Sequence, residues 1–271
     1  VSGRAGSLFP PGGRPRTSQI WTVIMQTIAV WFSCGVASAV AAKKTLEIYG
    51  PTYAVRVLNN PVIEEDADNI RFLKDVERWL GQPIETVSST KYPTSSAVDV
   101  WAHRKFMSGP TGAPCTIELK KRARQNWEAT NRVDWHVLGF TADERPRHNR
   151  FVLTERDNVL PVLIDLNLTK KDCHSILLAA GIAPPRVYAM GYPNANCIGC
   201  VKATSPTYWN LVRQKHPDVF AARAAQSREL GARLARHQGK RVFLDELPAD
   251  AKGKSLKTMS VECGIFCEEK P

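Results

Sequence analysis

The stretch TIAVWFSCGVASAV, residues 27–40, decides the fold. Its first part, from Thr27 to Phe32, is a continuous apolar run of the length of a buried strand. The residues from Val36 to Tyr49 are rich in alanine and have helical spacing, and Gly50 and Pro51 then predict the helix end. A buried strand that leads through a turn of small residues directly into a helix is typical of α/β proteins.

Strands and helices continue to alternate in the chain up to residue 205. Four further strands are predicted, at Tyr53–Leu58, Ile84–Val87, Asp134–Phe140 and Pro161–Leu166. Strands that are separated by helices pair in parallel, because each crossover returns the chain to the same end of the sheet. We therefore expect an α/β fold with a mainly parallel, doubly wound sheet that has helices on both faces.

The segment between the second and third predicted strands is amphipathic. Its apolar residues recur at helical spacing on one face, namely Ile70, Leu73, Val76, Trp79 and Leu80. The acids Glu64, Glu65 and Asp66 precede this face, where they would interact favourably with the positive end of a helix. Gly81 predicts the end of the same helix.

The last third of the chain is predicted to be mainly helical. One helix is expected from Lys170 to Ala180, with Thr169 as its N-cap and Gly181 after its end. The segment Pro206–His237 is mostly helical in pattern, and residues 249–271 form a tail that contains two cysteines. We expect residues 206–271 to fold over the α/β domain as helices and a cysteine-bearing tail.

Residues 1–24 are rich in Gly, Pro and Arg and precede the first strand. The apolar run from Ile20 to Phe32, followed by small residues at 36–39, also has the pattern of a signal peptide. The strand, turn and helix that follow one another from residue 27 favour a different interpretation. In this interpretation the folded domain begins at Met25 and residues 1–24 are an extension.

The composition is that of a folded, basic protein. The 271 residues are 43% apolar and 23% charged, which is close to the average of globular proteins. The 37 Lys and Arg against 26 Asp and Glu give a net charge of +11, which favours anionic partners such as nucleotides, nucleic acid or sulfate esters. Seven cysteines are too few for a disulfide scaffold of this length, so we expect thiols in a reducing cytoplasm. We also expect no attachment to a membrane.

The turn at residues 33–38 is a candidate phosphate cradle. It lies at the carboxyl end of the first strand, where doubly wound sheets bind their ligands. The hydroxyls of Ser33 and Ser38 would be donors beside the positive end of the helix, and Gly35 would allow a positive φ. The turn lacks the Gly-Lys-Ser/Thr of the Walker loop. We therefore expect residues 25–205 to be a nucleotide-binding α/β domain.

The cysteines form a second set of candidate functional residues. Cys197 and Cys200 stand in a C-x-x-C within a loop rich in turn formers, so their thiolates can share one metal or form a redox pair. Cys115 and one of the C-terminal pair, Cys263 or Cys267, would complete a shell of four thiolates for zinc or a 4Fe–4S cluster. The alternative is a set of reduced thiols without a metal.

From Met25 onward, the order of the motifs resembles the phosphoadenosine phosphosulfate reductase family, within the adenine-nucleotide alpha-hydrolase (PP-loop) superfamily. The resemblance covers most of the chain. Its parts are the turn at 33–38, PCTIELK at 114–120, GFTADE at 139–144 with Arg147, the segment 161–181, Gly191-Tyr192 with CIGC at 197–200, and ECGI at 262–265.

The resemblance implies an adenine sulfonucleotide bound by Ser33, Gly35, Ser38, Lys120, Glu144 and Arg147. It also implies that Cys263, on the tail, attacks the sulfur of this substrate and that a thioredoxin-like thiol then releases sulfite.

Iron–sulfur members of the family use a Cys-Cys pair together with a C-x-x-C. The ligands implied here are Cys115, Cys197 and Cys200, with Cys267 as the fourth if Cys263 is to stay available as the nucleophile. If Cys263 fills the fourth position instead, the reductase chemistry is lost in this form.

Three residues depart from the family pattern. Ala37, Thr141 and Phe266 stand where the family has Asp, Arg and His, so each removes a polar group from the expected nucleotide or sulfonate site.

Two alternatives are therefore open. Relatives in the superfamily adenylate substrates and deliver sulfur to nucleic acid, and the basic residues of the expected helices suit such a polyanion: Lys120, Lys121, Arg122, Arg124, Arg223, Arg228, Arg233 and Arg236. The other alternative is a non-catalytic, metal-stapled nucleotide-binding protein that has kept the fold.

Overall fold

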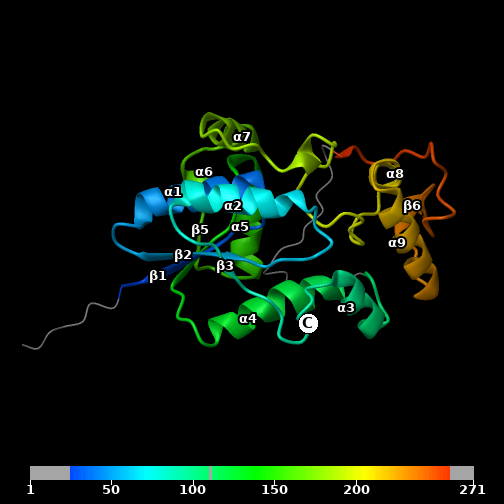
Figure 1. The fold of residues 1–271 in the computed structure, drawn as a ribbon, viewed down its shortest axis with the longest axis horizontal. Helices are drawn as coiled ribbons and strands as arrows, with labels where there is room; N and C mark the ends of the chain where they lie inside the picture. Colours follow the sequence, from blue (N-terminus) through cyan, green and yellow to red (C-terminus); the bar gives the residue numbers. More distant parts are fainter. Residues whose placement is uncertain (1–24, 110–111, 257–271) are drawn as a thin grey trace, which may run out of the picture.

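The computed structural model describes residues 25–109 and 112–256 and contains a five-stranded, all-parallel sheet (Figure 1). The strand order is β3-β2-β1-β4-β5. The strands are β1 (Thr27–Trp31), β2 (Ala54–Asn59), β3 (Glu85–Thr86), β4 (Trp135–Val137) and β5 (Val159–Leu160). The central strand β1 pairs with β2 from Thr27 onward and with β4 from Ile28 onward. The predicted α/β class with a parallel sheet is confirmed.

Helices cover both faces of this sheet. The first face packs against α1 (Val36–Tyr49), α2 (Asp68–Leu80), α6 (Val162–Asp165) and α7 (Lys170–Ala179). The second face packs against α4 (Arg122–Glu128) and α5 (Arg145–Thr154). In Figure 1, α1, α2 and α7 lie above the sheet and α4 lies below it. The central strand is apolar from Ile28 to Trp31, as expected of a strand whose two faces are both buried.

Several helix ends follow the predicted signals. α1 ends at Tyr49 with Gly50 as its C-cap, and α7 begins directly after Thr169. The Thr169 hydroxyl accepts from the N–H of Asp172, whose carboxylate accepts from the N–H of Thr169 in return. Gly81 and Gly181, which follow α2 and α7, have φ of 74° and 73°. This left-handed conformation ends a helix at little cost only when the residue is glycine.

The buried face of α2 agrees with the prediction except at Ile70, because Leu73, Val76, Trp79 and Leu80 all belong to the core beneath this helix. Ile70 is 64% exposed, whereas Phe72 and Val76 are buried. Asn69 is also buried, because its amide group donates to the Glu65 carboxylate and to the carbonyl of Ala195. A polar residue that is buried with partners is invisible in a hydrophobic pattern, so the burial of Asn69 was not predicted.

The predicted strand at residues 161–166 is wrong. β5 ends at Leu160, and Val162–Asp165 form the helix α6. Pro161 lies between them, and it has no N–H to donate to a sheet but fits the start of a helix. The apolar residues Val162, Leu163 and Ile164 are nevertheless buried. The apolar run therefore indicated burial, not a strand.

A further hydrophobic core lies beside the sheet. It is formed by α3 (Ala97–Arg104), α8 (Pro206–Lys215) and α9 (Pro217–Glu229), with Trp101 and Trp209 among its largest buried side chains. In Figure 1, α8 and α9 stand at one end of the molecule, next to the sheet and not on top of it.

The prediction of a mostly helical segment from Pro206 to His237 is wrong at the end of this segment. There, β6 (Ala235–His237) forms an antiparallel hairpin with β7 (Lys240–Val242). The two turn residues, Gln238 and Gly239, have φ of 47° and 76°. Positive φ at both positions is what a two-residue hairpin turn of type I′ requires, and it excludes a continuing helix.

Three short helical segments complete the described chain: the π-helix η1 (Thr116–Lys121) and the 3-10 helices η2 (Ala142–Glu144) and η3 (Arg186–Tyr188). Within the described residues, no helix is long and apolar enough to cross a membrane. The predicted extension at 1–24 lies outside the described residues, as do Cys263 and Cys267 of the predicted tail.

Candidate functional site

The order of the strands reverses at β1, which lies between β2 and β4. The chain moves from β1 towards β3 on one side and continues with β4 and β5 on the other. Doubly wound proteins bind ligands at this point, outside the carboxyl ends of the strands. The segments that leave β1 and β4 here are residues 33–38 and 138–141. We call these two segments the switch-point site.

Hydrogen bonds close the turn after β1 on itself. The N–H of Ser33 donates to Oγ of Ser38 over 3.1 Å, and this hydroxyl donates to the carbonyl of Gly35 over 2.9 Å. The two serine hydroxyls are 3.2 Å apart. The structure therefore brings the predicted residues Ser33, Gly35 and Ser38 together at the start of α1.

The backbone of this turn corrects the prediction for Gly35. Gly35 is extended, with φ of −98°, whereas Cys34 has φ of 53°. A left-handed conformation at a residue with a side chain costs about 1 kcal/mol or more. Gly35 matters for space instead, because a Cβ there would lie 3.5 Å from Oγ of Ser33 and 3.6 Å from the hydroxyl of Tyr188. A methyl group would fit, but it would fill the space between these hydroxyls.

Gly139 brings the segment after β4 into contact with the first turn of α1. A Cβ on Gly139 would lie 2.8 Å from the N of Ser38 and 3.1 Å from the C of Ala37. Both are backbone atoms, so they cannot move aside as the end of a flexible side chain can. Only glycine allows the two halves of the switch-point site to approach this closely.

Tyr188 covers the N-terminus of α1 and was not identified from the sequence. Its hydroxyl accepts from the N–H of Val36 over 3.4 Å. The ammonium of Lys170 lies 5.7 Å from the centre of the Tyr188 ring, and the His174 ring is in edge contact with it. Burial raises the pKa of the Tyr188 phenol to about 12, so it stays protonated. A lone tyrosine at the end of a short 3-10 helix carries no sequence signal for such a role.

Lys120 reaches the switch-point site from η1. The residue is 8% exposed, and its Nζ lies 3.6 Å from Oε1 of Glu65. Burial and the nearby Glu65 carboxylate raise the pKa of the Cys34 thiol, while the Lys120 charge opposes this rise. Cys34 therefore lies within electrostatic range of both charges, and the predicted role of Lys120 in nucleotide binding stays a prediction. Single π-helical turns are often found at functional sites.

The acids predicted to start α2 serve three different parts of the molecule. Glu64 accepts from the N–H groups of Ala97 and Val98 and so caps α3. Glu65 faces Lys120. The carboxylate of Asp66 accepts from the N–H of Asp68 at the start of α2 and binds Arg186. Only Asp66 therefore has the predicted role.

Glu144 and Arg147 are paired with each other at the start of α5. The Glu144 carboxylate accepts from the N–H of Thr141 and from the guanidinium of Arg147. The Arg147 guanidinium also lies 5.1 Å from the centre of the Phe140 ring. Glu144 acts electrostatically on Lys170, the residue over the Tyr188 ring. These contacts place Glu144 near the switch-point site, where it forms part of the framework.

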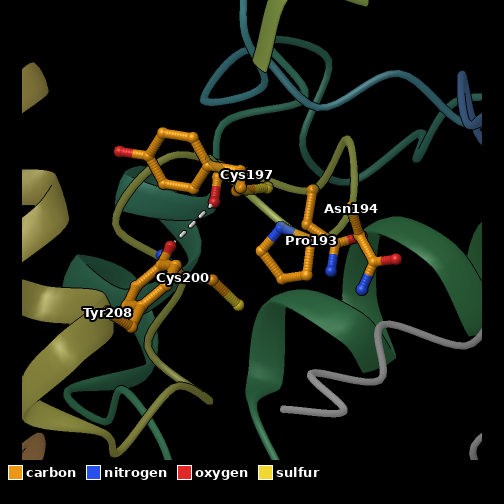
Figure 2. A pocket seen from close by; sticks show the side chains of 7 residues that line it. Pro193, Asn194, Cys197, Cys200 and Tyr208 are labelled. Atoms are coloured by element: carbon orange, nitrogen blue, oxygen red, sulfur yellow. Dashed lines mark hydrogen bonds between the residues drawn. The ribbon is translucent and has the colours of Figure 1, made fainter. Parts of the chain in front are cut away.

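The predicted C-x-x-C forms a tight turn that lines a small cavity of about 10 Å³ (Figure 2). Gly199 within it has φ of 70°. The Tyr208 hydroxyl accepts from the N–H of Cys200 over 2.8 Å and donates to the carbonyl of Cys197. In Figure 2, the side chains of Cys197 and Cys200 lie on the same side of this tyrosine as Pro193 and Asn194. A tyrosine on α8 thus clamps both ends of the cysteine turn.

Cys115 belongs to the same hydrophobic core as Cys197 and Cys200. Arg223, on α9, is 4% exposed, and its charge acts on both Cys115 and Cys197. The Nε of Arg223 is buried and has no hydrogen-bond partner among the described residues, although its guanidinium lies over the Trp101 ring at 4.3 Å. A buried cation therefore faces the predicted thiolate ligands.

A complete metal site is not present within residues 25–109 and 112–256. No group of three or more His, Cys, Asp or Glu side chains is arranged there to hold a metal ion. The predicted fourth ligand, Cys267, and the predicted nucleophile, Cys263, lie outside the described residues.

The basic residues predicted for a polyanion do not share one helical face. Arg124 and Arg223 are buried, and Arg228 is paired with Asp245 and Glu246. Arg236 is not helical, because it lies in β6.

The comparisons with known proteins identified no relative of this chain. No family model matches this chain, and no similar sequence is found among curated proteins. The resemblance to the phosphoadenosine phosphosulfate reductase family therefore stays a prediction, and the functional conclusion rests on the geometry of the residues.

Proposed function

We propose that this protein binds the phosphates of an adenine nucleotide at the switch-point site and acts as a phosphoadenosine phosphosulfate reductase-like enzyme. The observation that carries the proposal is the hydroxyl-lined turn at the start of α1, at the point where the strand order reverses. The 14-residue helix α1 directs a partial positive charge at this turn. Anions bind at such helix starts.

The hydroxyl of Tyr188 indicates where a phosphate oxygen would be bound. It accepts from the N–H of Val36, which is a donor that a phosphate oxygen could use in its place. Once displaced, the phenol can donate its own proton to the same phosphate, since burial keeps it protonated. Binding would thus replace one hydrogen bond within the protein by two hydrogen bonds from the protein to the phosphate.

Two lysines lie near groups of the proposed phosphate site. Lys120 lies near Cys34, and Lys170 lies over the ring of Tyr188. Burial lowers the pKa of the Lys170 ammonium, because the charged form is poorly solvated there. An anionic phosphate near these groups would offset the cost of burying their charges.

The reductive step is supported by the ECGI motif at 262–265. In this step the thiolate of Cys263 attacks the sulfur of a sulfonucleotide, an S–S bond forms, and the bond from sulfur to the phosphate oxygen breaks. The nucleotide leaves with that oxygen. A second thiolate, from a thioredoxin-like protein, then attacks Sγ of Cys263, and sulfite leaves with the electron pair of the S–S bond.

A zinc ion or a 4Fe–4S cluster is the proposed cofactor, held by Cys115, Cys197, Cys200 and Cys267. A group with four thiolate ligands carries net negative charge. The buried Nε of Arg223 fits such a group, because it has no hydrogen-bond partner in the described part of the chain and its charge interacts with Cys197 and Cys115 as well as with Glu64. A structural metal at this place would join η1 to the segment before α8 and to the tail.

The test is release of sulfite from adenosine phosphosulfate or phosphoadenosine phosphosulfate in the presence of reduced thioredoxin. Wild type should release sulfite, Cys263→Ser should release none, and Ser260→Ala, a control in the same tail, should match wild type. Metal analysis after anaerobic purification should show iron or zinc that Cys267→Ser loses and Cys263→Ser keeps. Nucleotide binding without any sulfite release would favour the non-catalytic alternative.

A further inference from the structure

We propose that the β6–β7 hairpin and Arg233 beside it bind the phosphate backbone of a nucleic acid. We call this surface the basic hairpin, and it consists of Arg233, Arg236, His237, Lys240 and Arg241. The proposal goes beyond nucleotide binding at the switch-point site, since it concerns different residues on a different element.

The charge of this surface is of one sign. Residues 230–244 include four Lys or Arg, at positions 233, 236, 240 and 241, and contain no Asp or Glu. All four residues are exposed, and none of them forms an ion pair with an acid in the described part of the chain. Arg228, on the adjoining helix α9, differs in this respect because Asp245 and Glu246 neutralise it. The basic hairpin therefore presents uncompensated positive charge.

The strand register places two arginines of the basic hairpin opposite each other. Arg236 is the direct cross-strand partner of Arg241, and His237 is the partner of Lys240. Like charges in such pairs destabilise a hairpin, whereas opposite charges would stabilise it. The stability of the fold thus gives no reason for this arrangement. A polyanion does, because phosphates placed along the ribbon would neutralise the Arg236–Arg241 pair and the neighbouring Lys240.

The basic hairpin is held in place by the rest of the molecule. The N–H of Arg236 donates to the carbonyl of Thr204 over 2.8 Å, and Ala235 and Leu244 are buried in the core shared by α8 and α9. The Arg241 guanidinium donates to the carbonyl of Leu234. The Arg233 guanidinium lies 4.8 Å from the centre of the Phe243 ring. Positive groups on a fixed ribbon lose less conformational freedom on binding than flexible tails do.

A nucleic-acid backbone fits this surface better than a single small anion. The charges are spread along a two-stranded ribbon, and no closed pocket surrounds any one of them among the cavities described. Contacts of this kind are made to phosphates and fix position without reading sequence. Binding should accordingly depend strongly on salt and weakly on sequence.

The test is fluorescence anisotropy with labelled RNA and DNA oligonucleotides of mixed sequence at several salt concentrations. Arg236→Glu with Lys240→Glu should weaken binding about tenfold or more and reduce the slope of log affinity against log salt by about 2. The matched control, Lys74→Glu with Lys105→Glu, makes the same change in net charge at exposed residues elsewhere. It should leave affinity within about twofold of wild type.

Equal weakening by the two double variants would overturn the proposal, because net charge alone would then explain binding. The absence of measurable binding by wild type would also overturn it. Arg236→Gln with Lys240→Gln provides a milder variant if charge reversal disturbs the fold. Adenine-nucleotide binding by the same variants keeps the two proposals apart, because the switch-point site should be unaffected.

Discussion

Two glycines of the switch-point site carry different constraints. Gly139 is needed because backbone atoms of α1 lie within 3.1 Å of the position of its missing Cβ. Gly35 has ordinary contacts of 3.5 Å or more at the same position. The first glycine therefore serves packing, and the second leaves space for a ligand.

Gly139→Ala should lower the free energy of unfolding by about 1–3 kcal/mol, because β4 and α1 must separate to admit the methyl group. Gly35→Ala, the matched control, should stay within about 1 kcal/mol of wild type. Urea unfolding followed by circular dichroism measures both. A Gly139→Ala protein as stable as wild type would show that the backbone of α1 leaves room for a methyl group at residue 139.

His136 on β4 should make stability depend on pH. Nδ1 of His136 accepts from the indole N–H of Trp31, and burial, assisted by the charges of Arg156 and Arg124, lowers the pKa of His136 from 6.5 to about 3. The unfolded chain therefore takes up a proton below pH 6.5, whereas the folded protein does so only near pH 3. The contribution of His136 to stability is present at neutral pH and is lost as the pH falls through this window.

Between about pH 7 and about pH 5, His136 should contribute a loss of up to about 2 kcal/mol in the free energy of unfolding. Urea unfolding of wild type and His136→Gln at both pH values isolates this share. An equal pH dependence in the two proteins would show that His136 is not the group responsible.

The thiols of Cys34 and Cys173 should be unreactive in the folded protein. Burial raises the pKa of the Cys34 thiol well above its ordinary value and that of Cys173 to about 12, so little thiolate exists at about pH 8. Mass spectrometry after treatment with iodoacetamide should find both residues modified only when guanidinium is present. Rapid labelling of Cys34 in the native protein would instead indicate an open turn after β1.

At the scale of elements, the sequence was most informative where local chemistry decides the structure. The strand and helix around the turn at 33–38 and the helix after Thr169 were predicted nearly to the residue, since apolar runs and capping side chains act locally. α6 was missed because an apolar run does not distinguish a buried strand from a buried helical turn. The roles of Glu64 and Glu65 were missed because their partners are distant in sequence.

Glu64 should stabilise α3 from outside that helix. Its carboxylate accepts from two backbone N–H groups at the start of α3 and from the hydroxyl of Ser96. Glu64→Ala should lower the free energy of unfolding by about 1–3 kcal/mol, because buried donors lose a charged acceptor. Glu47→Ala, on an exposed ion pair, should cost less than about 1 kcal/mol. Chemical unfolding of both variants measures the difference, and equal losses would contradict this role.

At the scale of the whole molecule, the candidate site depends on contacts between distant segments. Ser33, Gly35 and Ser38 could be predicted because they lie in one short turn after a buried strand. Tyr188 could not be predicted, since it reaches the same turn from more than 150 residues away in the sequence. The proximity of Arg223 to Cys115 could not be predicted either, because about 100 residues separate them. The tail with Cys263 and Cys267 lies outside the described residues, so these two roles stay predictions.

The proposed function requires that adenine nucleotide phosphates bind in the space beside Gly35. The most direct measurement is isothermal titration calorimetry of the full chain with ATP, adenosine phosphosulfate and phosphoadenosine phosphosulfate. Wild type should bind at least one of them. Gly35→Ala should bind it about tenfold or more weakly while its free energy of unfolding stays within about 1 kcal/mol of wild type, because the methyl group occupies the space between Ser33 and Tyr188. Unchanged affinity in Gly35→Ala, or no binding of any adenine nucleotide by wild type, would show that the phosphates do not bind beside Gly35.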